Sequence, residues 1–197
     1  MGTTKVNILG LFTDQTRNIS FTLVVDDFGV KHTKKEDAEH LLKTIQSKYV
    51  CKASWDPDYY LGITMEWDYV RRTCKLSMPG YVKQALIKFQ HVLRQRTCAP
   101  SPYTAPTYGT KRQMATTDKS PKMSADDQRL SQQVCGTFLC CARAVGCTMM
   151  RALNDLATKV NDGTETTVKA MKQFLDYCAT NPDCLLYTSP SPRDKRQ

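Results

Sequence analysis

The sequence predicts an α+β protein in which short strands fill the first part of the chain and helices fill the last part. Two features indicate strands: a β-branched run bounded by a glycine at residues 21–30, and two apolar segments between residues 59 and 77 that are separated by a polar stretch. Further along, apolar residues recur at three-and-four spacing between residues 124 and 179, which predicts three helices.

Composition places the chain among ordinary globular proteins. Its 197 residues are enough for one domain or two small ones, and 41% are hydrophobic and 24% charged. No apolar run approaches the ~18 residues that span a membrane, and the N-terminus lacks a basic-then-apolar secretory pattern. We therefore expect an intracellular protein with no membrane partner. The nine cysteines include no Cys-x-x-Cys pair, and we interpret them as small core residues in a reducing compartment.

Residues 21–30 (FTLVVDDFGV) predict a strand, a tight turn and the start of a second strand, with Asp26 and Asp27 at the turn. Two carboxylates are costly in an apolar strand unless cations neutralise them. Carboxylate oxygens suit Mg²⁺, which is held by one or two carboxylates together with substrate phosphates. On these residues alone, an ordinary Asp-Asp turn is favoured over a metal site.

Residues 34–49 predict an amphipathic helix that covers one face of a sheet. Thr33 and Glu36 have the spacing of a capping box at its start. The apolar face of this helix consists of Ala38, Leu41, Leu42, Ile45 and Tyr49.

A second hairpin is predicted from strands at residues 59–66 and 73–77. Gly62 lies in the first of these strands, where the absence of a side chain permits close approach of another backbone. Pro79 and Gly80 end the second strand, and a short helix begins at Tyr81. Residues 97–123 contain four prolines among Ser, Thr and Lys, which predicts a linker or a surface excursion that is mobile.

The C-terminal part predicts a small bundle of three helices. Ser124 and Asp127 are spaced as a cap for the first helix, Thr148 is placed to cap the second, and the third spans residues 165–179. The apolar stripes are Leu130, Val134, Phe138, Cys141 and Val145 in the first helix, Met149, Leu153, Leu156 and Val160 in the second, and Val168, Met171, Leu175 and Cys178 in the third.

The net charge of +9 is concentrated in the middle of the chain. Residues 61–130 carry 12 Lys and Arg against 5 Asp and Glu, whereas residues 1–60 and 131–183 are each balanced. Phosphate binding is the usual use of such a basic stretch. On charge alone, a solvated basic loop has equal weight.

Three segments, in this order, resemble the reverse transcriptase of copia-type LTR retrotransposons. Residues 20–29 (SFTLVVDDFG) resemble the catalytic hairpin with its aromatic-x-Asp-Asp motif, residues 60–65 (YLGITM) resemble the primer-grip hairpin, and residues 134–144 (VCGTFLCCARA) resemble the thumb. The resemblance covers residues 9–183. Val24 stands where the family's motif has its aromatic residue, which removes a side chain near the primer end.

The resemblance implies a division of the chain into four parts. Residues 1–80 would be the C-terminal part of a polymerase palm, residues 81–123 a helix with a Pro-rich linker, and residues 124–183 a thumb-like helical bundle. Residues 184–197 follow no periodicity and look like a translated sequencing adapter, so we expect a disordered, artefactual tail. A natural disordered tail with Ser-Pro phosphorylation sites is the alternative.

The resemblance also implies RNA-directed DNA polymerase activity by two-metal nucleotidyl transfer. Asp26 and Asp27 would be the catalytic ligands of Mg²⁺, with Mn²⁺ as the alternative ion, and Tyr60, Leu61 and Gly62 would form the primer grip. The implied partners are an RNA or DNA template with its primer, deoxynucleoside triphosphates and the remainder of the Pol polyprotein, in the cytoplasm or in virus-like particles. The expected nucleic-acid-binding residues are Arg71, Arg72, Lys75, Lys83 and Lys88.

In the family, a third palm carboxylate and the fingers precede the catalytic hairpin, and neither is found in this chain. We therefore expect a fragment that is inactive by itself. One alternative is a non-catalytic basic remnant of a decayed retroelement, which would bind nucleic acid in a salt-dependent way without using Asp26 or Asp27. Another is an unrelated small α+β protein with a chance Asp-Asp turn.

Overall fold

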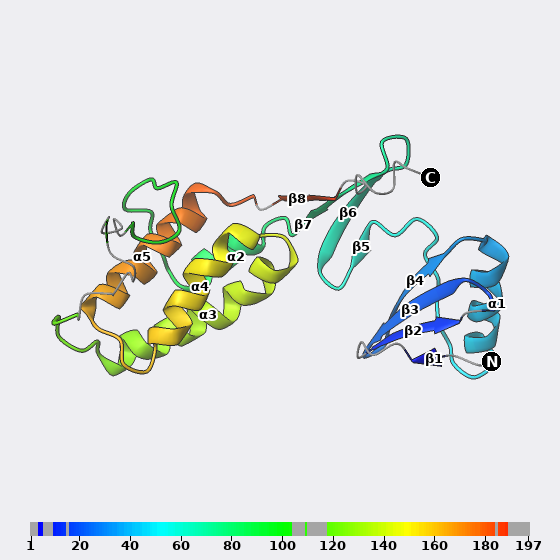
Figure 1. The fold of residues 1–197 in the computed structure, drawn as a ribbon, viewed down its shortest axis with the longest axis horizontal. Coiled ribbons are helices and arrows are strands. Elements are labelled where there is room, and N and C mark those ends of the chain that lie inside the picture. The colour runs from blue at the N-terminus through cyan, green and yellow to red at the C-terminus, as the bar shows by residue number, and fades with distance from the viewer. Residues whose placement is uncertain are drawn as a thin grey trace. The chain divides into compact units, whose positions relative to one another are not determined.

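The structure, a computed structural model, separates the chain into two compact units, residues 1–61 and residues 62–197. Each unit combines antiparallel strands with helices, so the predicted α+β class is confirmed (Figure 1). None of the helices in the described part of the chain is both long enough and apolar enough to cross a bilayer. The residues that the structure describes are 4–5, 10–14, 16–103, 109, 118–183 and 185–188.

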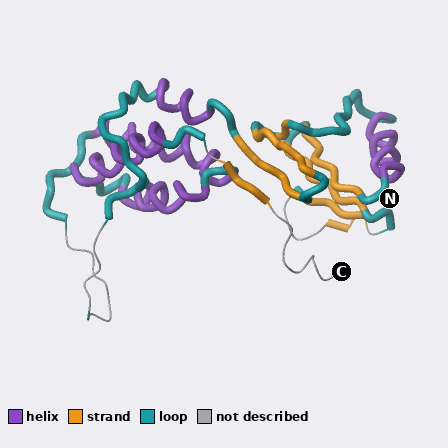
Figure 2. The backbone as a smooth tube through the Cα atoms, turned by 90° about the horizontal axis from the view of Figure 1, so that it is seen from above, coloured by secondary structure: helices purple, strands orange, loops and turns teal. Residues whose placement is uncertain are grey.

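The first unit is an antiparallel sheet with one helix on it. The strand order is β1-β2-β3-β4, and both views show α1 beside this sheet (Figure 2). Ile19, Ala38 and Leu41 are buried between them, with Phe21 and Ile45 packed at their edge. The elements are β1 Thr4–Lys5, β2 Leu11–Asp14, β3 Ile19–Val24, β4 Asp27–His32, α1 Lys35–Gln46 and the short β5 Tyr59–Tyr60.

The predicted helix is present, but its predicted capping box is wrong. The N-cap residue is Lys34, which makes no side-chain cap hydrogen bond. The Thr33 hydroxyl instead donates to the backbone carbonyl oxygen of Asn18, at 3.3 Å, and accepts from the Asn18 side-chain Nδ2 at 3.0 Å. This long-range contact therefore replaces the local cap. The predicted apolar face is also shorter than expected, because Tyr49 lies beyond the end of α1 and is exposed.

The second unit joins a hairpin to a helical bundle. Strands β6, β7 and β8 are consecutive antiparallel neighbours. A large apolar core lies between the helices. The elements are β6 Ile63–Asp68, β7 Thr73–Ser77, α2 Tyr81–Lys88, α3 Ala125–Ala144, a 3₁₀ turn at Cys147–Met149, α4 Met150–Lys159, α5 Glu165–Thr180 and β8 Leu185–Thr188.

Two phenylalanines form the centre of the helical core. Phe138 of α3 and Phe174 of α5 are fully buried, and their rings meet edge to face with centroids 5.3 Å apart. The predicted apolar stripes of the three helices are confirmed, since all of their members are buried except Leu130, which is partly buried. Phe174 is a central core residue that the sequence analysis did not select.

Of the two helix caps predicted in the bundle, one is confirmed. Ser124 is the N-cap of α3, and its hydroxyl oxygen accepts from the Asp127 backbone N–H at 3.1 Å. The cap predicted at Thr148 is wrong, because a 3₁₀ turn precedes α4 and Met149 is the N-cap residue. The Thr148 hydroxyl lies 3.1 Å from the Tyr177 hydroxyl instead.

The hairpin of β6 and β7 belongs to the helical unit, which corrects the domain boundary expected at residue 80. Ile63, Leu76 and Met78 pack against the helical core, and this apolar contact ties the hairpin to the bundle. The continuous strand predicted at residues 59–66 is also wrong. Leu61 and Gly62 have φ of 50° and 84°, a left-handed conformation that interrupts an extended strand.

Both described ends of the predicted linker at residues 97–123 are bound, the first to α5 and the second to the residues that start α5. The Thr97 N–H donates to the Thr180 hydroxyl at 3.3 Å, and the Gln173 side-chain amide donates to the Ala99 carbonyl at 3.2 Å. Near the other end, Lys122 forms an isolated antiparallel bridge with Thr164. The expectation of mobility is therefore wrong for these flanks, because side chains of α5 bind the backbone of the first and backbone hydrogen bonds hold the second. Residues 104–108 and 110–117 lie outside the described residues.

The tail expected to be disordered contributes a strand. Leu185–Thr188 form β8, which pairs antiparallel with β7 in the register Leu76 to Leu186. A strand edge presents unpaired donors and acceptors, and a short β-prone segment satisfies them whatever its origin. The expectation is thus wrong for these four residues, whereas residues 184 and 189–197 lie outside the described residues.

The cysteines follow the interpretation as core residues only in part. Cys74, Cys141 and Cys178 are buried, whereas Cys98, Cys140 and Cys147 are exposed. Burial raises the pKa of the Cys74 thiol above its usual value, which keeps this thiol protonated and unreactive.

Removal of the Phe138 ring should destabilise the helical bundle. Phe138→Ala leaves a cavity against Phe174, and such changes cost about 3–5 kcal/mol. Urea unfolding followed by helical circular dichroism measures the loss. Ile87→Ala on α2 is the control, because this side chain is 75% exposed and its removal creates no cavity. Equal effects of the two changes would contradict the described core.

Deletion of residues 184–197 should expose one edge of β7. The backbone groups of Cys74–Ser77 that bond to β8 would then bond to water, so their amide hydrogens should exchange roughly tenfold faster or more. Hydrogen exchange followed by mass spectrometry or NMR measures this, with the amides of α3 as the internal reference. Unchanged protection of β7 would show that β8 does not pair with it in solution.

Candidate functional site

The predicted catalytic hairpin is present as a tight two-residue turn. β3 ends at Val24 and β4 begins at Asp27, and these two residues are cross-strand partners, so only Val25 and Asp26 remain in the turn. Val25 has φ of 54° and is 90% exposed. Positive φ is uncommon and strained for a β-branched residue, and turns of this kind usually place glycine there. The strand ladder therefore holds the turn against the local preference of Val25.

The carboxylates of Asp26 and Asp27 are both exposed at this turn. In the described part of the chain, neither carboxylate accepts a hydrogen bond or lies within ion-pair distance of a cation. A carboxylate pair without a protein partner retains its full capacity to accept hydrogen bonds or to ligate a hard cation. The hairpin therefore presents two adjacent anionic groups to whatever binds there.

The strand register fixes the face of the sheet on which Asp27 lies. Directly opposite residues of an antiparallel pair point to the same side, and successive residues alternate. Asp27 opposite Val24 thus shares a face with Gly29 opposite Thr22. Ile19 and its neighbour Phe21 point to the other side, where α1 packs. Asp27 consequently lies on the face of the sheet that α1 leaves open.

Tyr60, a predicted primer-grip residue, packs on this same open face. Its hydroxyl lies 3.0 Å from the Thr22 hydroxyl. A Cβ atom on Gly29 would lie 2.8 Å from the Thr22 hydroxyl oxygen and 3.0 Å from the Tyr60 ring, so only glycine fits beneath that ring. The structure therefore brings Tyr60 beside the hairpin that carries Asp27. A glycine inside a strand is the sequence signal that could have predicted such close packing at Gly29.

Asp14 is a further carboxylate of this unit, but it does not join the pair. Asp14 is opposite Ile19, and so it lies on the face that α1 covers. Its carboxylate accepts hydrogen bonds from the Thr16 hydroxyl at 2.6 Å and from the Thr16 N–H at 2.9 Å, which lower the pKa of Asp14 below its usual value. Asp14 thus stabilises its own turn. Among the described residues, no group of three or more metal-ligating side chains is assembled.

The other two predicted primer-grip residues, Leu61 and Gly62, have a local conformational role. An added Cβ on Gly62 would meet only the Met78 methyl group, at 4.0 Å, so crowding does not require glycine there. Its φ of 84° does, because few residues other than glycine adopt this conformation without strain. Their contact with a primer stays a prediction.

Three of the predicted nucleic-acid-binding residues lie on the hairpin of β6 and β7. The Arg71 side chain is 82% exposed, with its Nε 3.8 Å from the Asp68 carboxylate. Arg72 is exposed in the same turn. Lys75 differs, because its Nζ lies 3.0 Å from both carboxylate oxygens of the cross-strand residue Glu66. This ion pair offsets the charge that Lys75 would offer to a phosphate.

The remaining two, Lys83 and Lys88, are exposed on α2. The Lys88 ammonium lies 5.7 Å from the centre of the Phe89 ring, and Lys83 has no ion-pair partner in the described part of the chain. All five predicted cations except Lys75 are thus open to an anionic ligand. Gly62 and these five residues belong to the second unit, whereas Asp26, Asp27 and Tyr60 belong to the first.

Comparisons with known protein families, with curated proteins and with solved structures found no match to this chain. The geometry of the hairpin and the distribution of charge therefore carry the functional argument.

Proposed function

We propose that the chain is a fragment of an RNA-directed DNA polymerase of the copia-type retrotransposon class, with Asp26 and Asp27 as its metal-binding carboxylates. The observation that supports this most directly is the β3–β4 hairpin. It places two exposed carboxylates, both without a partner in the described part of the chain, at a tight turn, and it directs Asp27 to the face opposite α1. An ordinary surface turn does not require a strained β-branched residue at its tip.

Asp26 and Asp27 fit the requirements of Mg²⁺, which takes one or two carboxylates and completes its octahedral shell with water and substrate phosphates. Bound there, Mg²⁺ would activate a primer 3′-hydroxyl and neutralise charge on the departing pyrophosphate. The chain itself contributes the position of the carboxylates, because the ladder of β3 and β4 fixes them. The Tyr60–Thr22 contact holds β5 on the same face.

A complete polymerase site needs groups that the described residues do not assemble. We propose that a third carboxylate and the nucleotide-binding fingers come from the remainder of the Pol polyprotein, and that the fragment does not polymerise by itself. The substrates of the complete enzyme would be a primed RNA or DNA template and deoxynucleoside triphosphates.

The second candidate function is nucleic-acid binding without chemistry, as in a decayed element. The charge distribution favours this candidate, since residues 61–130 carry 12 Lys and Arg against 5 Asp and Glu. Arg71, Lys83 and Lys88 are exposed. Counterion release would make such binding strongly dependent on salt. The two candidates differ in what they require of Asp26 and Asp27.

Replacement of either hairpin carboxylate should abolish primer extension in a polymerase completed with the missing upstream half. Asp26→Asn and Asp27→Asn keep the side-chain size but remove a charge that holds the metals. Loss of either negative charge should lower the rate of primer extension on the order of a thousandfold or more. Single-turnover primer extension measures the rate, and fluorescence anisotropy of a labelled primer–template measures binding, which should change little.

Asp58→Asn provides the matched control, because Asp58 is another exposed carboxylate of the first unit, located just before β5. It should leave both the rate and the affinity unchanged. Parental rates in both hairpin variants would show that these carboxylates do not bind the catalytic metals. The polymerase proposal would then fail, while binding by the basic residues would remain.

The ion pair of Lys75 should be visible in the salt dependence of nucleic-acid binding. Lys83→Ala should reduce the slope of log K against log salt by about 0.9 on duplex DNA, measured between about 50 and 200 mM salt. Lys75→Ala should reduce it by less, because Glu66 already neutralises this side chain. Equal slopes for the Lys75 and Lys83 variants would contradict this difference.

A further inference from the structure

The turn of the β6–β7 hairpin carries an exposed pair of aromatic rings that the primer-grip assignment does not use. Trp67 and Tyr69 stack nearly parallel, with centroids 6.2 Å apart and an interplanar angle of 11°. They are 48% and 73% exposed. Large aromatic side chains bury much apolar area when they are covered, so an exposed stacked pair indicates a binding surface.

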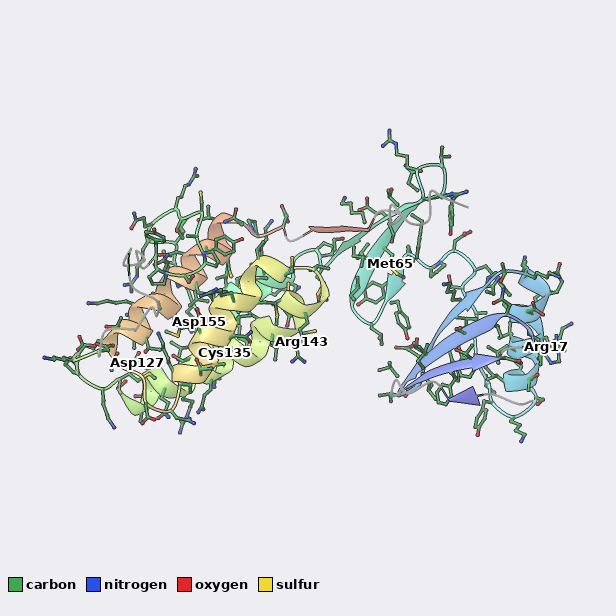
Figure 3. All side chains as sticks on the ribbon, viewed as in Figure 1. Arg17, Met65, Asp127, Cys135, Arg143 and Asp155 are labelled. Atoms are coloured by element: carbon green, nitrogen blue, oxygen red, sulfur yellow. The ribbon has the colours of Figure 1, made fainter. Side chains whose placement is uncertain are left out.

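The hairpin holds this pair firmly, at the end remote from the helices. Trp67 lies opposite Cys74, and Met65 lies opposite Leu76, so these four side chains share one face of the hairpin. Leu76 packs against the helical core, whereas Trp67 lies near the turn. Figure 1 shows the hairpin running away from the helices of its unit, and Figure 3 labels Met65 on β6. The rings thus lie at the turn of a hairpin that the helical core anchors at its other end.

Two arginines, Arg71 and Arg72, follow the aromatic residues in the same turn. The Asp68 carboxylate accepts the Arg71 backbone N–H at 2.9 Å, which fixes the turn. The same carboxylate lies 3.8 Å from the Arg71 Nε, too far for a strong charge-assisted hydrogen bond. Arg72 is exposed, with φ of 53°. Cationic side chains therefore lie within a few residues of the stacked rings.

We propose that Trp67, Tyr69, Arg71 and Arg72 form a binding platform for single-stranded nucleic acid, named here the hairpin platform. An unpaired base stacked on Tyr69 extends the Trp67–Tyr69 stack, and the two guanidinium groups bind the adjoining phosphates. Aromatic stacking combined with cations that follow the backbone is the general mode of single-strand binding. A duplex offers no free base face to these rings except at its ends.

The surrounding charge favours a polyanion over a protein as the ligand. Trp, Tyr and Arg are also enriched at protein interfaces. However, the hairpin lies within residues 61–130, where Lys and Arg outnumber Asp and Glu by 12 to 5. The proposal goes beyond the polymerase function, because it concerns binding by the second unit alone. It holds whether or not Asp26 and Asp27 bind a metal.

The chain contains only two tryptophans, Trp55 and Trp67, which allows a direct optical test. In the Trp55→Phe variant, Trp67 is the sole indole reporter, and titration with oligo-dT should quench its fluorescence through base stacking. In the Trp67→Phe variant, the remaining Trp55 emission should stay constant at the same oligonucleotide concentrations. Quenching confined to Trp55 would overturn the proposal.

Affinity measurements on the full chain complete the test. Tyr69→Ala and Arg71→Ala should each weaken the binding of fluorescent oligo-dT, the former by roughly 5- to 100-fold, which corresponds to loss of one stacked base. Tyr69→Ala removes a largely exposed side chain, so the fold should tolerate it. An unchanged circular dichroism spectrum of the Tyr69→Ala variant verifies this.

The chain provides a matched control for each change. Tyr103 is 83% exposed and belongs to the same unit. Arg151 is 88% exposed, with its Nε 3.8 Å from the Asp155 carboxylate, which reproduces the environment of Arg71 beside Asp68. Tyr103→Ala and Arg151→Ala should alter the affinity by less than about twofold.

Three further results would overturn the hairpin platform. The first is equal weakening by the control and platform variants, which would indicate general electrostatic binding. The second is tighter binding of the matching blunt duplex than of the single strand. The third is the absence of any oligonucleotide binding at low salt, which would leave a protein as the ligand of the exposed rings. None of these results bears on primer extension by the Asp26 and Asp27 variants, so failure of the platform and failure of the polymerase proposal are distinguishable.

Discussion

The pairing of β3 with β4 is the constraint on which the candidate site depends. With Val24 opposite Asp27, only two residues remain for the turn, and Val25 is forced to positive φ. A shift of one residue in this register would move Asp27 to the face that α1 covers, because side chains alternate along a strand. The packing of Tyr60 over Gly29 opposes that shift, since the shift would place Phe28 or Val30 where only glycine fits. A close contact on the open face thus fixes the position of two exposed charges.

Local sequence patterns predicted the elements whose determinants are also local. The cap of α3 at Ser124 and the apolar stripes of the bundle depend on residues three and four positions apart, and they are present as predicted. The caps expected at Thr33 and Thr148 failed because each hydroxyl bonds to a distant partner, Asn18 or Tyr177. Spacing alone does not reveal such competition.

Long-range packing decided the features that the sequence did not predict. The hairpin of β6 and β7 joins the helical unit through Ile63 and Leu76, a contact with residues far along the chain. The predicted linker is bound at its first end by side chains of α5 and at its second end by a backbone bridge to Thr164, and β8 fills an open edge of β7. At the candidate site the hairpin and its tight turn were predicted correctly, although only Asp26 lies in the turn and Asp27 begins β4. The packing of Tyr60 over Gly29 was missed, because a glycine does not identify the side chain that covers it.

The two chemistries proposed for the chain are separable because each unit stabilises its own groups. The carboxylates Asp26 and Asp27 are positioned by the sheet of the first unit, whose core contains Ile19 and Leu41. The exposed rings and arginines of the β6–β7 turn are positioned by a hairpin that the helical core anchors through Leu76. Loss of the negative charges of Asp26 and Asp27 leaves the fold of the second unit intact. A sequence that lost its chemistry would therefore keep its affinity for nucleic acid, which is why binding alone cannot identify a polymerase.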